Sequence, residues 1–171
     1  EGALQAALEG YGFSGDAAAA LERMAAAEAE SLILHEVGEA RAEPLLGPAW
    51  REMLGDLPGR RAELLARAVR DNLADCLSTL PALIECGKSP ALHFYFANFE
   101  GVRRSLFPRL WSAYAAWRKS DDTADLIVAC SDGQAHWEAA ALRLLAAWRS
   151  DPAAAAGHFS DWLDEPGPLA L

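Results

Sequence analysis

The sequence predicts an all-α protein, a single-domain helical bundle of six to seven helices joined by short loops. Alanine occurs throughout, β-branched residues are few, and no stretch alternates apolar and polar side chains over the length of a strand. A chain of 171 residues suits one domain that buries a core without disulfides or metal. We therefore expect one helical domain over residues 1–165 and a frayed C-terminal tail over residues 166–171.

Caps, prolines and glycines divide the first half of the chain into helices. Ser14 or Asp16 can cap a long first helix, which we expect to end near Ala42, before two prolines and a glycine. A short helix is expected over 50–54. The next helix is expected over 58–79, because proline suits a first helical turn, and a connection containing one apolar turn should follow it.

The second half is divided in the same way. We expect helices over 89–106 and 108–117, because a Ser-Pro pair opens the first and the next proline ends or kinks it. A capped helix over 122–130 should pause at a serine and a glycine before a strongly helical stretch over 134–148. A last short helix is expected after Asp151.

Charge and cysteine content exclude several classes of partner. The formal net charge is -10, from 25 acidic and 15 basic residues. Such a surface repels phosphates, so we expect no nucleic-acid partner and no membrane partner. No apolar run reaches the roughly 18 residues needed to span a bilayer. Three cysteines without CxxC spacing fit reduced thiols, and so a cytoplasmic location, better than disulfides or structural zinc.

Polar residues interrupt an apolar stripe of the long first helix. At roughly 100° per residue, Glu28, His35 and Glu39 share one sector with two leucines and a methionine. His35 and Glu39 are one turn apart, close enough to hold the same ion. A central helix with polar residues on a buried face is where bundle proteins place metals or substrates. The alternative is that His35 lies on the solvent side and only pairs with Glu39.

A second group of candidate ligands lies in "HFYFANFE". His93 and Glu100 are two turns apart on the helix expected there, so they can present an imidazole and a carboxylate to a shared site. The alternative is that Glu100 only pairs with Arg104 at i,i+4. Asp75 and His136 border the core sides of two further helices and are reserve ligands.

Several other chemistries lack their motifs. There is no HExxH, no Walker loop, no GxGxxG after a strand and no GxSxG. Asp71 is expected to point away from the core toward Arg67, as a surface ion pair of little energetic weight. Metal binding through the histidines and carboxylates is therefore the most specific function that the residue pattern favours.

Carboxylates and imidazoles that project from several helices resemble the non-haem di-iron proteins of the haem-oxygenase-like and ferritin-like classes. In the haem-oxygenase-like class the first ligand helix often carries Glu and His seven apart, which Glu28 and His35 match. In place of the later HxxxDxxH, "HFYFANFE" has Ala97 for the aspartate and Glu100 for the last histidine, and the Glu-x-x-His pairs of the ferritin-like class are missing. The resemblance covers 16–106 and implies O2-dependent oxidation or metal storage with iron or manganese. The ligands it implies are Glu28, His35, Glu39, His93 and Glu100.

Two other functions stay open at this point. One is a non-catalytic acidic domain that binds a protein partner or forms a homodimer. The other is a metal-free pocket in which His35 and Glu39 orient a small polar molecule. The metal hypothesis makes the sharpest geometric prediction, because it requires the side chains of His35, Glu39, His93 and Glu100 to converge on one centre.

Overall fold

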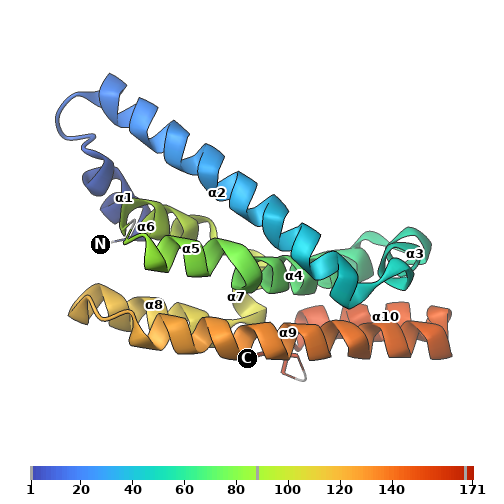
Figure 1. Ribbon diagram of the computed structural model, residues 1–171. Coiled ribbons are helices and arrows are strands. Elements are labelled where there is room, and N and C mark those ends of the chain that lie inside the picture. The colour runs from blue at the N-terminus through green and yellow to red at the C-terminus, as the bar shows by residue number, and fades with distance from the viewer. Residues whose placement is uncertain (1, 88, 168) are drawn as a thin grey trace.

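The computed structural model describes residues 2–87, 89–167 and 169–171, and every regular element in these residues is a helix (Figure 1). The all-α prediction is therefore confirmed. None of the helices described is long and apolar enough to cross a membrane. In chain order the elements are α1 (Ala3–Tyr11), α2 (Ala17–Leu46), α3 (Pro48–Asp56), α4 (Arg60–Ala74), the π-helical segment η1 (Asp75–Thr79), α5 (Leu80–Glu85), α6 (Ser89–Asn98), α7 (Gly101–Leu106), α8 (Pro108–Ser120), α9 (Ala124–Ser150) and α10 (Pro152–Asp164).

The long first helix, α2, begins as expected and ends later than expected. The carboxylate of Asp16 caps it by accepting hydrogen bonds from the backbone N–H groups of Ala18 and Ala19, at 3.0 and 3.1 Å. The helix continues past Ala42 to Leu46, with Pro44 inside its last turn. A proline so close to the end removes one backbone hydrogen bond without stopping the helix.

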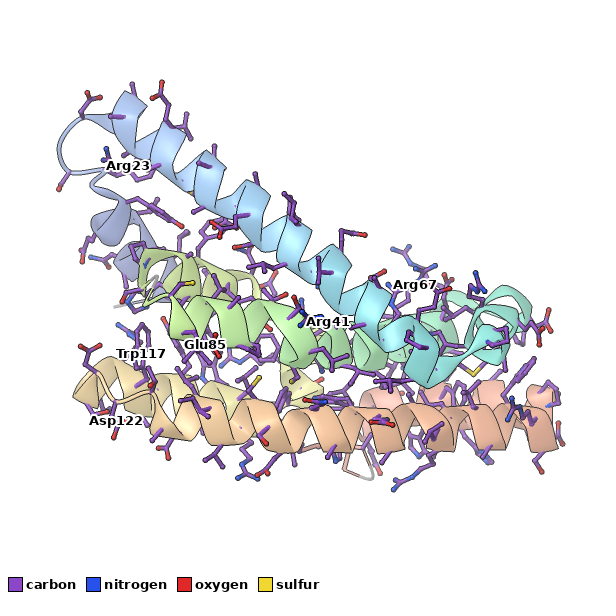
Figure 2. The ribbon with its side chains drawn as sticks, in the orientation of Figure 1. Arg23, Arg41, Arg67, Glu85, Trp117 and Asp122 are labelled. Carbon is purple, nitrogen blue, oxygen red and sulfur yellow. The ribbon has the colours of Figure 1, made fainter. Side chains whose placement is uncertain are left out.

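The connection expected after residue 79 is instead part of a continuous helical path. Pro81 has no N–H to donate to the carbonyl of Leu77, and Arg41 Nη1 donates to that carbonyl at 2.7 Å, from the point where α2 passes over this segment (Figure 2). The N–H of Leu80 bonds the carbonyl of Asp75, five residues back, which makes this turn π-helical. One inserted proline therefore loosens the helix into η1 without breaking it.

The expected helix over 89–106 is broken, and the expected pause inside α9 does not occur. Gly101 has φ 59°, so α6 ends at Asn98 and α7 starts afresh in a new direction. Gly133, by contrast, is helical, and a Cβ atom there would lie 2.7 Å from Phe107 Cζ and 2.8 Å from Cys76 Sγ. The second glycine serves close packing of α9 on η1, whereas the first provides a turn.

Helix α4 lies between α2 on one side and α9 and α10 on the other (Figure 1). The core contains large aromatic side chains, with Trp137, Tyr114 and Phe96 almost fully buried. The helices α2 and α4 cross at Gly38, where an added Cβ would lie 2.2 Å from the carbonyl oxygen of Ala74. Only glycine allows this approach, which brings the middle of α2 onto η1.

Toward its N-terminus, α2 moves away from the body of the protein (Figure 1). Leu21, Leu32 and Ile33 are 58%, 67% and 63% exposed. The apolar stripe inferred from the sequence is therefore not buried along this half of α2. The reason is the crossing at Gly38, because two straight helices that touch at one point separate on both sides of it.

The C-terminal tail is packed against the bundle, so the expectation of a frayed segment over 166–171 is wrong for the described residues. Leu169 is fully buried, and its carbonyl accepts a hydrogen bond from His136 Nε2 at 2.8 Å. The backbone of Leu171 bonds the carbonyl of Leu106 at 2.9 Å and the N–H of Arg109 at 3.0 Å. Burial of one leucine and these hydrogen bonds offset the ordering of a short segment.

Candidate functional site

Asp75, the first residue of η1, is a buried carboxylate at the centre of a polar network. Its side chain is 2% exposed. It accepts hydrogen bonds from Tyr95 Oη at 2.8 Å, from His35 Nδ1 at 2.8 Å and from Arg103 Nη2. Burial by itself raises the pKa of Asp75, but the hydrogen bond from His35 and the charge of Arg103 outweigh it, and the pKa is lowered. Asp75 is therefore an ionised, fully partnered anchor for the groups around it.

His35 is oriented by that anchor. Its Nδ1 donates to Asp75, so Nε2 points the other way and lies 3.4 Å from Glu39 Oε1. The hydrogen bond to Asp75 raises the pKa of His35 more than partial burial lowers it. A histidine held at Nδ1 by a carboxylate, with Nε2 facing outward, is the arrangement of metal-binding and acid–base histidines. The side chain is 25% exposed, so part of the imidazole is accessible from outside.

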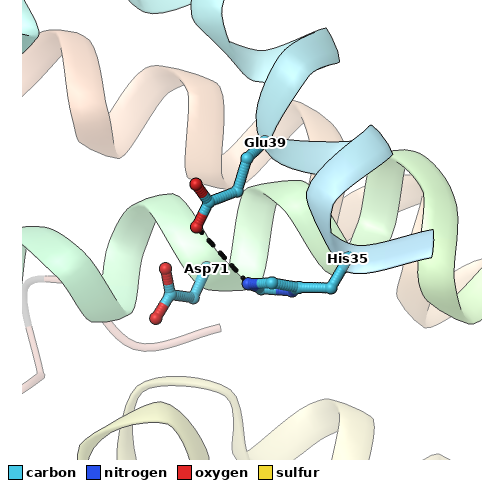
Figure 3. A group of neighbouring side chains, drawn as sticks. All are labelled: His35, Glu39 and Asp71. Carbon is cyan, nitrogen blue, oxygen red and sulfur yellow. Dashed lines mark ion pairs between the residues drawn. The ribbon is translucent and has the colours of Figure 1, made fainter. Parts of the chain in front are cut away.

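His35, Glu39 and Asp71 form a compact group of ligand-type atoms (Figure 3). One atom from each side chain lies within 4.8 Å of the other two, and in the described part of the chain this is the one such group of three or more. The residues come from two helices, His35 and Glu39 from α2 and Asp71 from α4. The close crossing of α2 and α4 at Gly38 brings them together.

Asp71 was interpreted from the sequence as a partner of Arg67, and this is wrong. Arg67 instead bonds Glu63, one turn earlier, at 2.6 Å. The nearest cation to Asp71 is Arg70, whose Nη2 lies 3.0 Å from Asp71 Oδ1 and 2.6 Å from Glu39 Oε1. The two carboxylates that face His35 are thus bridged by a guanidinium.

His93 does not join this group. Its Nδ1 lies 2.9 Å from Tyr114 Oη, and its ring packs on Tyr114 and Trp117 of α8. The reason is helical geometry: Tyr95 faces Asp75, and a residue two positions earlier on α6 is rotated by roughly 200° from it. Burial and the charge of Arg118 lower the pKa of His93.

The remaining sequence-predicted ligands also lie outside the group of three. Glu100 is exposed and precedes α7, because the helix break at Gly101 removes it from the register of α6. Glu28 accepts a long hydrogen bond, 3.5 Å, from Tyr11 Oη. The reserve ligand His136 holds the tail, and Asp75 acts through His35. The expected convergence of His35, Glu39, His93 and Glu100 is therefore wrong beyond its first two members.

Sequence reasoning missed three members of the network, namely Tyr95, Arg103 and Asp71. Tyr95 stood in an aromatic run that resembled core, and Arg103 in a short basic pair. No local pattern marked them, because their common partner Asp75 lies on a π-helical turn that shifts the α-helical register. The one available signal was the i,i+4 pair of aspartates at positions 71 and 75, which costs stability unless cations or a ligand lie between them.

The fold and site define an all-helical domain in which a buried aspartate holds a histidine and an arginine beside a small group of potential metal ligands. Residues 1–166 match the model of a family described as "Family of unknown function (DUF6866) C-terminal domain". Because the match spans almost the whole chain, the chain belongs to this family. No curated protein and no solved structure matches the chain.

Proposed function

We propose that this domain binds one divalent transition-metal ion, iron(II) or manganese(II), through His35, Glu39 and Asp71. The observation that carries the proposal is the hydrogen bond from His35 Nδ1 to Asp75, which leaves Nε2 facing the two carboxylates. One imidazole and two carboxylates form a mixed nitrogen and oxygen set that suits these ions and leaves positions open for water or substrate. A carboxylate behind the imidazole raises its basicity and keeps its orientation.

The charges of the group suit a dication. Glu39 and Asp71 contribute two negative charges, and the guanidinium of Arg70 bridges them. A bound metal therefore competes with the Arg70 guanidinium for the same oxygens. It also competes with a proton for His35 Nε2, so metal affinity should rise with pH through the pKa of His35.

The number of ligands favours a single ion over the di-iron pair implied by the resemblance. Di-iron bundles draw carboxylates and histidines from all their helices. Among the residues that the structure describes, the group of three stands alone. His93 bonds Tyr114 outside it, and Glu100 is exposed before α7. We therefore propose a mononuclear centre that supports oxidation or metal handling. The metal there would polarise a bound oxygen atom.

Titration of metal-depleted protein with Mn2+, followed by calorimetry, tests the proposal. We expect one equivalent to bind, with affinity reduced at least about tenfold in His35→Ala and in Asp71→Asn. His158→Ala is the matched control, because this histidine is exposed on α10 and should leave binding unchanged. Equal binding by His35→Ala and His158→Ala, or no saturable binding by the unaltered protein, would overturn the proposal.

Arg70→Gln tests the same site through an expected gain, and not a loss, of Mn2+ affinity. Removal of the competing guanidinium should tighten Mn2+ binding, because both carboxylates then lack their cation. Arg67→Gln is the control, since Arg67 pairs with Glu63 one turn away. Weaker binding by Arg70→Gln would mean that Arg70 positions the carboxylates and that the proposed competition is absent.

A second candidate function is self-association through α2. Leu21, Leu32 and Ile33 are more than half exposed on this helix, and Val37 is 38% exposed. Exposed apolar groups of this kind favour contact with another protein surface, here a second copy of the chain. Light scattering should find a dimer that Ile33→Glu dissociates; a monomer at all concentrations would exclude this candidate.

A further inference from the structure

Two of the three cysteines meet across helices that are distant along the chain. Cys76 is on η1 and Cys130 is on α9, and both are buried free thiols. Cys130 Sγ donates a hydrogen bond to the backbone carbonyl of Cys76 at 3.4 Å, and the thiol of Cys76 is hydrogen-bonded to that of Cys130. The third cysteine, Cys86, is exposed. The metal proposal uses none of these thiols.

Gly133 makes room for the contact between the two cysteines. It lies about one turn after Cys130 on α9, and a Cβ atom there would lie 2.8 Å from Cys76 Sγ. The sulfur of Cys76 therefore lies against the face of α9 that Cys130 and Gly133 share. Cα atoms of η1 and α9 come within 8 Å of each other, close to the roughly 7 Å that a disulfide spans. Rotation of the two side chains and little backbone movement can therefore join the sulfurs.

A hollow of about 270 Å³ leads to this pair. Cys76 and Cys130 line it together with Ile84 of α5 and the polar side chains of Ser131 and Gln134 of α9. A hollow of this size has room for several water molecules and therefore for hydrogen peroxide, which is small and polar. The two cysteines are only 3% and 5% exposed, so the hollow admits a small oxidant and excludes bulky thiol reagents.

The surroundings give the two thiols different roles. The hydrogen bond with Cys130 raises the pKa of Cys76, and burial and the negative charges of Cys130 and Asp75 raise it further. Cys76 is therefore the thiol that keeps its proton, and Cys130 is the one that can react as a thiolate. Only the thiolate is a good nucleophile, so Cys130 reacts first and Cys76 resolves the product.

From this geometry we infer that Cys76 and Cys130 are a peroxide-sensitive pair that closes to an intramolecular disulfide. The Cys130 thiolate attacks one oxygen of hydrogen peroxide, the O–O bond breaks, and hydroxide leaves while Cys130 becomes a sulfenic acid. The sulfur of Cys76 then loses its proton and attacks the sulfur of Cys130, and the sulfenic oxygen leaves as water. The two thiols together lose two electrons, and the peroxide gains them and ends as two water molecules.

The disulfide fixes η1 to α9 at the residue that follows Asp75. It joins positions 54 apart in the chain, and a cross-link over so long a loop restricts the unfolded state strongly. Thiol reductants reopen the bond by exchange, as is usual for disulfides of redox-sensing proteins. Neither cysteine belongs to the group of His35, Glu39 and Asp71, so failure of this inference would leave the metal proposal standing.

Peptide mapping of the unaltered chain by mass spectrometry tests the inference. Folded protein is treated with hydrogen peroxide in the presence of a chelator, and the remaining thiols are then blocked with N-ethylmaleimide in urea. We expect peptides linked through Cys76 and Cys130, which dithiothreitol separates. The oxidised protein should also unfold at a urea concentration about 1 M higher than the reduced protein. Recovery of both buried cysteines as blocked thiols, or linkage only through Cys86, would overturn the inference.

Serine variants separate the roles of the two thiols. Cys76→Ser should gain oxygen at Cys130, as sulfenic or sulfinic acid, because no resolving thiol is left. Cys130→Ser should gain none at Cys76, which burial and the charge of Asp75 still keep protonated. Cys86→Ser is the matched control and should form the linkage at the unaltered rate.

Circular dichroism will verify the fold of each variant, and the peptide map of the unaltered chain decides the inference even where a variant does not fold. Equal oxygen uptake at the single buried cysteine of Cys76→Ser and Cys130→Ser would contradict the assigned roles. Loss of the linkage in Cys86→Ser would contradict a direct reaction between Cys76 and Cys130.

Discussion

His35 on α2 and His93 on α6 were both candidate metal ligands in the sequence. Their surroundings shift the two pKa values in opposite directions. A buried carboxylate, Asp75, holds His35 and raises its pKa. His93 packs on aromatic rings beside the Tyr114 hydroxyl, and burial together with the positive charge of Arg118 lowers its pKa. The same residue type is thus prepared for a cation or proton in one region and kept neutral in the other.

This difference shows that the hydrogen-bond partner of Nδ1 determines whether Nε2 is suited to bind a proton or a metal ion. Behind His35 lies an ionised acceptor, and in front of Nε2 lie Glu39 and Asp71. Behind His93 lies a phenol whose own pKa is raised by burial, so it provides no negative charge. The region around His35 is therefore the functional candidate, while the region around His93 is packing that connects α6 to α8.

Removal of Asp75 should have the largest effect on stability, because Asp75 is the residue that makes the surroundings of His35 differ from those of His93. Asp75→Ala leaves the partly buried Arg103 without its counter-ion, and it removes the hydrogen-bond acceptor of both His35 and the Tyr95 hydroxyl. We expect a loss of about 3–5 kcal/mol in the free energy of unfolding, measured by urea titration. Asp71→Ala, at the partly exposed end of the group, is the control and should cost less than about 1 kcal/mol. Similar losses in the two variants would mean that Asp75 is not the anchor.

A methyl group at Gly38 should give the next largest effect, confined to the His35 region. The added Cβ of Gly38→Ala would lie 2.2 Å from the Ala74 carbonyl oxygen, so α2 must move off α4. We expect a loss of about 1–3 kcal/mol despite the better helix propensity of alanine, and a shift of His35 signals in NMR spectra. Gly157→Ala in α10 is the matched control.

Nothing lies within 4 Å of a Cβ at Gly157, so the same change there should stabilise the protein by up to about 1 kcal/mol. The signals of His93 should stay in place in both variants. A Gly38→Ala protein as stable as Gly157→Ala would show that α2 does not need its close approach to α4.

The smallest expected effect is the difference between the pKa values of His35 and His93, which titration of the two imidazoles measures. NMR should place the pKa of His35 above its ordinary value of 6.5 and that of His93 below it. A raised folded-state pKa gives stability that is present below pH 6.5 and is lost as pH rises through the folded-state pKa. A lowered one gives stability that is present above pH 6.5 and is lost as pH falls toward the folded-state pKa.

The stability difference between the unaltered chain and His35→Gln should therefore shrink as pH rises above 6.5 and through the raised pKa of His35. The corresponding difference for His93→Gln should shrink as pH falls below 6.5. The charged groups around His35 are Asp75, Arg103, Glu39, Asp71 and Arg70. The same pH dependence for both variants would remove the distinction between the two sites.

Part of the site could be predicted from the sequence and part could not. His35 and Glu39 were correctly paired, because residues four apart on one helix face the same way whatever the helix packs against. The placement of His93 and Glu100 failed, because it assumed one unbroken helix and an unknown rotation of that helix about its axis. A two-residue difference along α6 separates Tyr95, which faces Asp75, from His93, which faces α8.

The fold shows the same division. Alanine content, the Asp16 cap and the Ser-Pro and Asp-Pro starts were enough to predict helices and most of their beginnings, since these effects act within a few residues. Gly101 and Gly133 were not distinguishable in the sequence, although one turns the chain and the other lets two helices touch. Which role a glycine has depends on a neighbour that is distant along the chain.

The helices, their main caps and the pairing of His35 with Glu39 could therefore be predicted from the sequence. Each of these features follows from interactions between residues that are near neighbours in the chain. Tertiary structure alone decided that Asp71 joins His35 and Glu39, and that Asp75 is buried between His35 and Arg103. The physical reason is the crossing of α2 over α4 and η1. Contacts across that crossing join residues about 40 positions apart, and no local pattern records which of them will meet.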